Sequence, residues 1–216
     1  MNIKLFEINT LHFPKIQNVS LTKRMTEALT VRVVLIGDSQ VGKTSLIHRF
    51  VRSSFEKQQK GTIGAVFHTY EQQLNGRQVV MQIWDTAGQE KYRSLGPIYY
   101  RNAAAGIAVF DVTSKESLPS LERWISEFKK HTDNPLLFIV GNKIDIDDSI
   151  VIKLEEAQEF ATNHGAKCFL TSAKTGENVK EMFQSVFDDL VKAGKIVSDK
   201  PLKPEEADGA SNGSCC

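Results

Sequence analysis

The sequence lacks several features that would place it in a class at once. It has no run of about eighteen apolar residues, so we expect no membrane-spanning helix. It has only three cysteines, and neighbouring Cys215 and Cys216 beside the remote Cys168 do not make a disulfide framework. Its five histidines are scattered singly, which argues against a metal site built from histidine. The net charge of +1 gives no reason to expect nucleic-acid binding.

The two ends of the chain differ in composition from its middle. Residues 1–29 show neither clear periodicity nor the compact apolar block of a secretory signal, so we expect a disordered extension on a cytosolic chain. Residues 194–216 are rich in charged residues, Pro, Gly and Ser, and we expect a disordered tail. Residues 30–193 have the length of one ordinary domain, although Met25 also lies where a compact domain could begin.

The most informative stretch, residues 37–44, reads Gly-Asp-Ser-Gln-Val-Gly-Lys-Thr. Its spacing is typical of a phosphate-binding loop, in which backbone N–H groups surround an anion and a lysine meets the outer oxygens. The apolar run at 31–36 predicts a buried strand before the loop, and the spacing of apolar residues at 46–51 predicts a helix after it. Strand, loop and helix are the parts that this motif requires, and they disfavour an ordinary glycine-rich turn.

The rest of the domain alternates apolar runs with amphipathic segments. The pair Asn75-Gly76 between two alternating segments predicts a β-hairpin. Further strands are predicted at 107–112, at 136–140 and near Phe169, and helices at 118–128, 154–163 and 179–191. This alternation predicts a mainly parallel sheet wrapped by helices, with ligands beyond the carboxyl ends of the strands.

Three polar segments follow predicted strand ends, at 85–89, 142–145 and 172–174. In the first, Asp85 is placed to hold Mg²⁺ through water, since Mg²⁺ keeps several waters. In the second, Asp145 can accept two hydrogen bonds from the N1–H and N2–H₂ edge of guanine, a pair of donors that adenine lacks. An adenine nucleotide would leave this carboxylate unsatisfied, so the sequence predicts guanine.

Together, residues 37–44, Thr62, 85–89, 142–145 and 172–174 resemble the five nucleotide-binding motifs of the Ras-like small GTPases. The resemblance implies the α/β fold of a P-loop NTPase, with a mainly parallel six-stranded sheet, one antiparallel strand and helices on both faces. It also implies GTP and GDP as bound nucleotides, Mg²⁺ as cofactor, and slow hydrolysis of GTP to GDP and phosphate.

The resemblance further assigns roles to the matching residues. Lys43 would contact the β- and γ-phosphates, and Gln89 would orient the attacking water, so that Gln89, Thr62 and Lys43 form the catalytic set. Mg²⁺ would be held by Thr44, Thr62 and Asp85, and Asp145 would read guanine. The other expected nucleotide contacts are Gln40, Val41, Gly42, Ser45, Phe55 stacking on the base, Gly88, Asn142, Lys143, Ser172, Ala173 and Lys174. Individually, Thr62 could be a turn residue, Gln89 a solvated loop residue and Phe55 a core residue.

The predicted hairpin carries aromatic residues on polar faces. Phe67 alternates with polar residues on the first strand, and Trp84 shares a face with Gln82 on the second, so both are expected to be partly exposed. The alternative is that they simply pack against each other across the hairpin. Position beside the two segments that contact the terminal phosphate favours a surface for partners.

The aromatic residues indicate a particular group within the Ras-like GTPases. Phe67, Trp84 and Tyr99 resemble the aromatic triad of the Rab GTPases, and Tyr99-Tyr100-Arg101 and the terminal Cys215-Cys216 are also Rab-like. Residues 62–67 and 94–100 most resemble the early-endosome branch. The chain departs from the family pattern at Gln40, Val66 and Asn102.

A Rab-like chain is expected to be a switch that regulates vesicle traffic. The γ-phosphate would hold the Thr62 segment and the Gly88 amide and release them after hydrolysis. The resemblance implies effectors, an exchange factor, a GTPase-activating protein, a prenylation escort and a GDP-dissociation inhibitor as partners of a monomeric chain. It also implies two geranylgeranyl groups on Cys215 and Cys216, and cycling between cytosol and the cytoplasmic face of intracellular, endosomal membranes.

Two other functions stay open at this point. A binding module could hold GTP with negligible turnover and act only as a recruitment platform, although Gln89 and Thr62 argue against it. An ATP-using P-loop enzyme is the other, and Asp145 argues against it.

Overall fold

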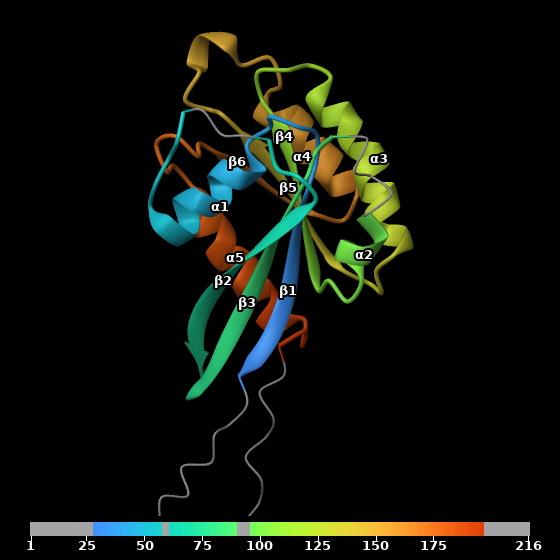
Figure 1. The fold of residues 1–216 in the computed structure, drawn as a ribbon. Coiled ribbons are helices and arrows are strands. Elements are labelled where there is room, and N and C mark those ends of the chain that lie inside the picture. The colour runs from blue at the N-terminus through green and yellow to red at the C-terminus, as the bar shows by residue number, and fades with distance from the viewer. Residues whose placement is uncertain (1–27, 58–60, 90–95, 197–216) are drawn as a thin grey trace, which may run out of the picture.

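The computed structural model describes residues 28–57, 61–89 and 96–196. Its centre is a six-stranded sheet in the order β2-β3-β1-β4-β5-β6 (Figure 1). Strands β2 and β3 pair antiparallel, and every other neighbouring pair is parallel, which confirms the predicted sheet. The strands are β1 (Leu29–Ile36), β2 (Ala65–Leu74), β3 (Arg77–Thr86), β4 (Ala105–Asp111), β5 (Leu136–Asn142) and β6 (Lys167–Thr171).

Helices cover both faces of the sheet, as predicted. Helices α1 and α5 lie on one face, and α2, α3 and α4 lie on the other (Figure 1). The helices are α1 (Lys43–Arg52), α2 (Gly96–Tyr100), α3 (Ser117–Lys130), α4 (Leu154–Asn163) and α5 (Val179–Lys192), with a 3₁₀ turn η2 (Asp147–Ser149). The predicted helices lie within a few residues of these bounds.

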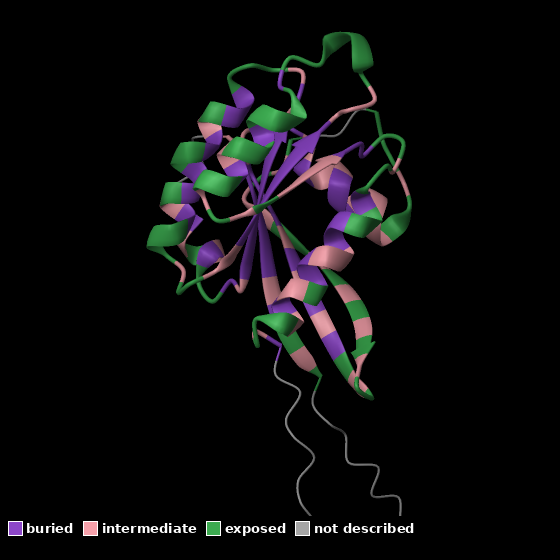
Figure 2. Ribbon diagram, turned by 180° about the vertical axis from the view of Figure 1, so that it is seen from behind, coloured by how far each residue is buried: buried purple, intermediate pink, exposed green. Residues whose placement is uncertain are grey.

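Strand β1 explains why its sequence is apolar without alternation. Val33 and Leu35 face the core under α1 and α5, and Val34 and Ile36 face the core under α3 and α4. The central strands are therefore buried on both sides (Figure 2). Burial of these side chains stabilises the sheet by about 25 cal/mol for each Å² of apolar area removed from water.

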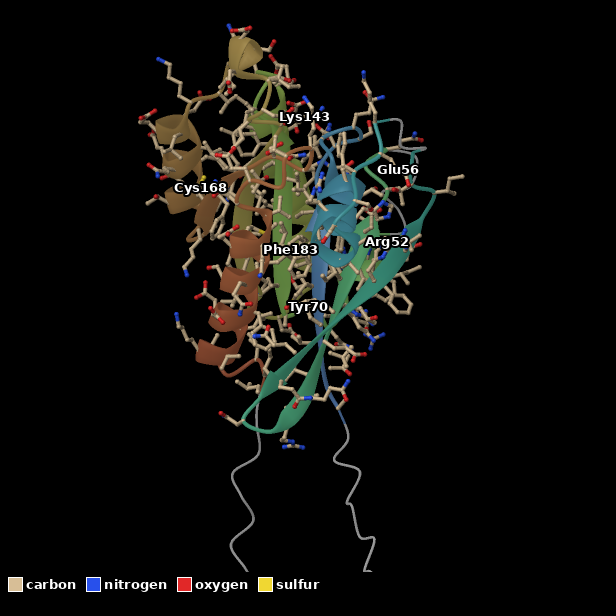
Figure 3. All side chains as sticks on the ribbon, turned by 90° about the vertical axis from the view of Figure 1, so that its left-hand side faces the viewer. Arg52, Glu56, Tyr70, Lys143, Cys168 and Phe183 are labelled. Carbon is tan, nitrogen blue, oxygen red and sulfur yellow. The ribbon has the colours of Figure 1, made fainter. Side chains whose placement is uncertain are left out.

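Aromatic rings fill the layer between α5 and the β2–β3 hairpin. The Phe50 ring lies 4.6 Å from the ring of Tyr70 and 4.2 Å from that of Phe183. Figure 3 shows Tyr70 on β2 and Phe183 on α5. This stack joins α1, α5 and the hairpin behind the phosphate-binding loop.

The hairpin turn has the predicted chemistry. Asn75 and Gly76 have φ values of 50° and 78°, the left-handed conformation that Asn-Gly turns favour. Along β2, Phe67, Thr69 and Glu71 are exposed, which agrees with the predicted side-chain alternation.

Cys168 lies on the edge strand β6. Its apolar neighbours in the sequence predict a buried small residue, but Cys168 is only partly buried, because β6 has a neighbour on one side alone. Burial nevertheless raises the pKa of its thiol to about 11, so this cysteine is a poor nucleophile at neutral pH.

The described chain enters and leaves at the same end of the molecule. Strand β1 begins and helix α5 ends at the end opposite the phosphate-binding loop (Figure 1). Ile196, the last described residue, packs into the core. Met25, Cys215 and Cys216 lie outside the described residues. In the part of the chain that the structure describes, every helix is too short or too polar to span a bilayer.

Candidate functional site

A cavity of about 830 Å³ opens at the carboxyl ends of the strands. Its lining comes from all five predicted motifs, so the fold brings together segments separated by more than a hundred residues. The predicted residues that line it are Gln40, Gly42, Lys43, Thr44, Ser45, Phe55, Thr62, Gly88, Gln89, Asn142, Lys143, Asp145, Ala173 and Lys174. Figure 3 shows Lys143 at this end of the sheet.

Three predicted residues lie behind the lining instead. The Val41 side chain packs into the core, and its carbonyl accepts a hydrogen bond from Asn142 Nδ2 at 2.9 Å. Ser172 is fully buried and donates to Asp145 at 2.6 Å. Asp85 is 2% exposed and lies beside the hydroxyls of Thr44 and Thr62. The side chains of Val41 and Ser172 therefore support the site rather than line it.

The glycines of the loop are required sterically. Gly37 and Gly42 have φ values of 134° and 102°, which side-chain-bearing residues rarely adopt. A Cβ on Gly42 would lie 2.2 Å from Asn142 Nδ2, and one on Gly37 would lie 2.3 Å from the Val109 carbonyl oxygen. Gln40 also has a positive φ of 64°, at a position where the Rab-like pattern has a smaller residue.

Lys43 points into the loop. Its Nζ donates to the carbonyl oxygens of Gly37 at 2.8 Å and Asp38 at 2.7 Å. The side chain is buried, and this burial lowers the pKa of Lys43 to about 8. A desolvated ammonium beside a glycine-rich loop favours a bound anion.

Three oxygen-bearing side chains meet at one point of the cavity. Thr44 and Thr62 donate to the same oxygen, Oδ2 of Asp85, at 2.7 and 3.1 Å, and their own hydroxyl oxygens lie 3.0 Å apart. Asp85 Oδ1 is buried and has no hydrogen-bond partner among the residues that the structure describes. Burial raises the pKa of Asp85, because an uncompensated buried carboxylate is unfavourable.

This donor set fits Mg²⁺. The ion prefers hard oxygen ligands, binds through one or two carboxylates and keeps several waters. It would also satisfy the orphaned oxygen of Asp85. In ranges 28–57, 61–89 and 96–196, no group of three or more His, Cys, Asp or Glu side chains is arranged to hold a metal ion.

The other side of the cavity is organised by Asn142. Its side chain donates to the Val41 carbonyl and accepts a hydrogen bond from the Ala173 amide at 3.0 Å, so it joins the phosphate-binding loop to residues 172–174. Asn142 is 1% exposed and hydrogen-bonded on both sides. It holds the two halves of the site at a fixed separation.

Asp145 is presented as an ionised acceptor. Burial alone would raise its pKa, but the hydroxyl of Ser172 and the ammonium of Lys174, 3.1 Å away, hold the pKa of Asp145 below its ordinary value. A carboxylate that stays charged suits two neighbouring N–H donors of a base. Phe55 lines the cavity and is 37% exposed, which disfavours the alternative that it is a core residue.

The two segments at the mouth of the cavity lie close to the phosphate-binding loop. A Cβ on Gly88 would lie 2.3 Å from the carbonyl carbon of Asp38, so the chain after β3 packs directly on the loop backbone. Gln89 Nε2 would lie 3.6 Å from a Cβ on Gly61. Thr62, Gly88 and Gln89 are thus brought together although 26 positions separate Thr62 from Gly88.

Sequence reasoning missed three residues that hold the site in place. Arg49 of α1 donates from Nε to the Ala173 carbonyl at 2.8 Å and from Nη2 to the Lys174 carbonyl at 2.5 Å. Asp111 accepts from Lys143 Nζ at 2.5 Å. Asp38 bonds to helix α3. Their partners lie far away in the sequence, so no local pattern marks them, although a carboxylate inside a phosphate-binding loop calls for cationic or donor partners elsewhere.

Phe67, Trp84 and Tyr99 pack against one another, and Phe67 stays exposed. Phe67 and Trp84 are register partners with ring centroids 5.3 Å apart, and Tyr99 lies 6.0 Å from Trp84. Phe67 is nonetheless 51% exposed. Large apolar side chains nearby in sequence are also exposed, namely Ile63, Val66 and Ile98.

Comparison with known proteins agrees with this geometry. Residues 32–192 match the model of the Ras family. The chain is 40% identical to "Ras-related protein Rab5" of Nicotiana tabacum, over 91% of this chain and 100% of that protein. It is 38% identical to "Ras-related protein RABF2b" of Arabidopsis thaliana, over 88% of this chain and 96% of that one. It is 40% identical to "GTP-binding protein ypt3" of Schizosaccharomyces pombe, over 80% and 79%. The chain therefore belongs to the Ras family of small GTPases and is of the Rab type within it.

Proposed function

We propose that this GTPase is a switch whose GTP form recruits effectors during vesicle traffic, at endosomal membranes. The observation that carries the proposal is the meeting of Thr44, Thr62 and Asp85 beside the phosphate-binding loop. Thr62 lies in the segment that leads to the exposed Phe67 of β2. A ligand at this point therefore acts on the conformation of a surface that partners can contact.

Each residue of the site has a separate role in hydrolysis. Lys43 places an ammonium against the outer phosphates, and Asp145 fixes the base. Gln89 lines the cavity, where its amide can hold the attacking water. Bound Mg²⁺, held by Thr44, Thr62 and Asp85, would neutralise charge on the phosphate oxygens. Catalysis is then mostly positioning and electrostatic stabilisation.

The lining also favours the slow intrinsic turnover that the family resemblance implies. No arginine lines the cavity in the part of the chain that the structure describes. An arginine supplied by an activating protein is worth about 10³ to 10⁵ in rate in this type of reaction. We propose that a GTPase-activating protein supplies this missing charge.

Substitution of Gln89 tests the hydrolytic role. In Gln89→Leu, the apolar side chain of similar size cannot hold the water, and we expect single-turnover GTP hydrolysis to slow by roughly tenfold or more. The affinity for GDP should stay close to wild type, because the change lies outside the diphosphate pocket. If wild type and Gln89→Leu are equally inert, the chain is a GTP-dependent binding module and the hydrolytic proposal is wrong.

The affinity for GDP should fall at alkaline pH, because Lys43 loses its positive charge there. In the ligand-free site the pKa of Lys43 is about 8, whereas a bound phosphate keeps the ammonium charged. Above that pH, binding must therefore take up a proton, and the affinity for GDP should drop about tenfold between about pH 7 and pH 9. Calorimetry in two buffers of different ionisation enthalpy should detect this uptake on the alkaline side of that pKa and little of it at neutral pH. An affinity that is independent of pH, without proton uptake, would contradict it.

Phe67, Trp84 and Tyr99 are proposed as the centre of the effector surface. Their rings are in contact, and Phe67 projects from a strand whose outer face is exposed. Aromatic residues in such a setting are enriched at the centres of protein interfaces. Phe67→Ala should therefore weaken effector binding in the GTP form while leaving nucleotide affinity unchanged, as measured by titration against an effector captured on the GTP form.

Membrane attachment is proposed through Cys215 and Cys216, which lie outside the described residues. The tail lysines are offset by acidic residues, so no basic patch assists adhesion, and one lipid alone binds only marginally. Two geranylgeranyl groups would suffice, and mass spectrometry of the C-terminal peptide tests for them. Helix α5, the last described helix, ends opposite the cavity (Figure 1).

The location and the partners are proposed from the relatives. Similarity to a protein named Rab5, together with the early-endosome resemblance of residues 62–67, supports endosomal membranes. The expected partners are an exchange factor, a prenylation escort and a GDP-dissociation inhibitor besides the effectors. Affinity capture on the GTP-analogue and GDP forms would identify them, and identical partners for both forms would refute the switch.

A further inference from the structure

An acidic side chain lies inside the phosphate-binding loop, where its negative charge opposes a bound phosphate. Asp38 follows Gly37, and its carboxylate is bound by helix α3. Trp124 Nε1 donates to Oδ1 at 2.8 Å. The Ser120 hydroxyl donates to Oδ2, and the Arg123 guanidinium pairs with Oδ1. Three donors from one helix thus converge on this carboxylate.

The main chain of the same residue forms part of the nucleotide site. The carbonyl oxygen of Asp38 is one of the two acceptors of Lys43 Nζ, at 2.7 Å. Gly88 also packs against the carbonyl group of Asp38. A Cβ added to Gly88 would lie 2.3 Å from the Asp38 carbonyl carbon and 2.4 Å from its oxygen. Asp38 therefore contacts α3 through its side chain and two functional segments through its backbone.

We infer that Asp38 is a positioning residue that fixes the phosphate-binding loop to helix α3. The inference rests on the proposed nucleotide site and adds an element that lies outside all five motifs, the face of α3 that carries Ser120, Arg123 and Trp124. Asp38 contacts no reacting atom. It holds the carbonyl that orients the Lys43 ammonium and the backbone against which Gly88 closes. Because Arg123 is 53% exposed, this connection runs from the molecular surface to the phosphate site.

The isosteric change Asp38→Asn tests the inference. It removes the charge that pairs with Arg123 and replaces Oδ2, the acceptor of the Ser120 hydroxyl, by an NH₂ group that cannot accept, so the attachment of the loop to α3 weakens without loss of volume. We expect GDP, followed with a fluorescent analogue, to dissociate roughly tenfold faster. Trp124→Phe removes one donor and should accelerate dissociation as well. In the double variant the two effects should not multiply, because both break the same connection.

A matched control separates positioning from loss of stability. Ile125→Val removes one buried methyl group from the same helix and is not among the partners of the Asp38 carboxylate, so it should lower the melting temperature without changing GDP dissociation. If Asp38→Asn does not yield folded protein, Ser120→Ala together with Trp124→Phe must reproduce the acceleration. Unchanged dissociation, or fully multiplicative effects of Asp38→Asn and Trp124→Phe, would overturn the inference.

The same assays distinguish this inference from the proposed function. If wild-type protein fails to bind GDP, the nucleotide site itself is wrong. If wild type binds and hydrolyses normally while the three α3 contacts have no influence, only the role of Asp38 is wrong.

Discussion

Replacement of Asp145 by asparagine is expected to lower the affinity for GDP by roughly 10⁴-fold, and to transfer that affinity to xanthosine diphosphate. In the wild-type site, Ser172 and Lys174 hold the carboxylate in place and ionised, so it can accept from two adjacent N–H groups. An asparagine amide offers one oxygen and one NH₂ group. The NH₂ group would oppose the exocyclic amine of guanine, whereas xanthine has a carbonyl at that position. Equilibrium displacement with GDP, xanthosine diphosphate and ADP measures the change.

A neighbouring acid supplies the control for this prediction. Asp147, two positions along the chain, is exposed on η2, and Asp147→Asn should leave all three affinities unchanged. Wild-type protein should reject ADP, because adenine presents no pair of donors to Asp145. Equal binding of ADP and GDP by wild type would show that the carboxylate does not read the base, and would favour an ATP-using enzyme.

Gly88→Ala is expected to reduce single-turnover GTP hydrolysis on the order of 10²-fold. The added Cβ would lie 2.3 and 2.4 Å from the carbonyl carbon and oxygen of Asp38, and 2.4 Å from the Ser39 nitrogen. These are backbone atoms that cannot move aside as a side chain can, so the segment must stay away from the phosphate-binding loop. Gln89, the next residue, then loses its position. GDP affinity should change little, because the diphosphate pocket is intact.

Replacement of a second glycine, Gly165, is the control that separates the steric clash at Gly88 from the general effect of replacing a glycine by alanine. Gly165 has a positive φ of 67°, which Gly88 does not, and no described atom would lie within 4 Å of a Cβ there. Gly165 does not line the cavity. Gly165→Ala should cost about 1 kcal/mol of folding stability from its strained backbone and leave hydrolysis unchanged. Normal hydrolysis by Gly88→Ala would contradict the packing of this segment on the loop.

The features that sequence could predict are those set by neighbouring residues. The apolar run of β1, the Asn75-Gly76 turn and the strand-end motifs each encode a local structure. Because parallel strands share one edge, the motifs after successive strands could be expected to meet there. The clustering of Lys43, Gly88 and Asp145, which follow β1, β3 and β5, at one cavity agrees with that topology.

The features that sequence could not predict depend on contacts between distant segments. Arg49 bonds to Ala173 and Lys174, which follow it by 124 and 125 positions in the sequence. Asp38 bonds to helix α3, which follows it by more than eighty positions. A single arginine or aspartate at a polar position is compatible with many folds, so neither residue belongs to a pattern that would predict its partner. The indirect role of Ser172 was missed for the same reason, since its burial depends on how β6 and the following loop pack.

Amide hydrogen exchange tests the central claim most directly. The terminal phosphate is proposed to fix the segment carrying Thr62 and the one carrying Gly88 onto the phosphate-binding loop. Amide exchange at residues 61–64 and at Gly88 and Gln89 should therefore be markedly slower with a non-hydrolysable GTP analogue than with GDP. The exchange rates of β4 and β5 should be the same in the two complexes. Equal exchange of those segments in the two complexes would contradict the proposed switch.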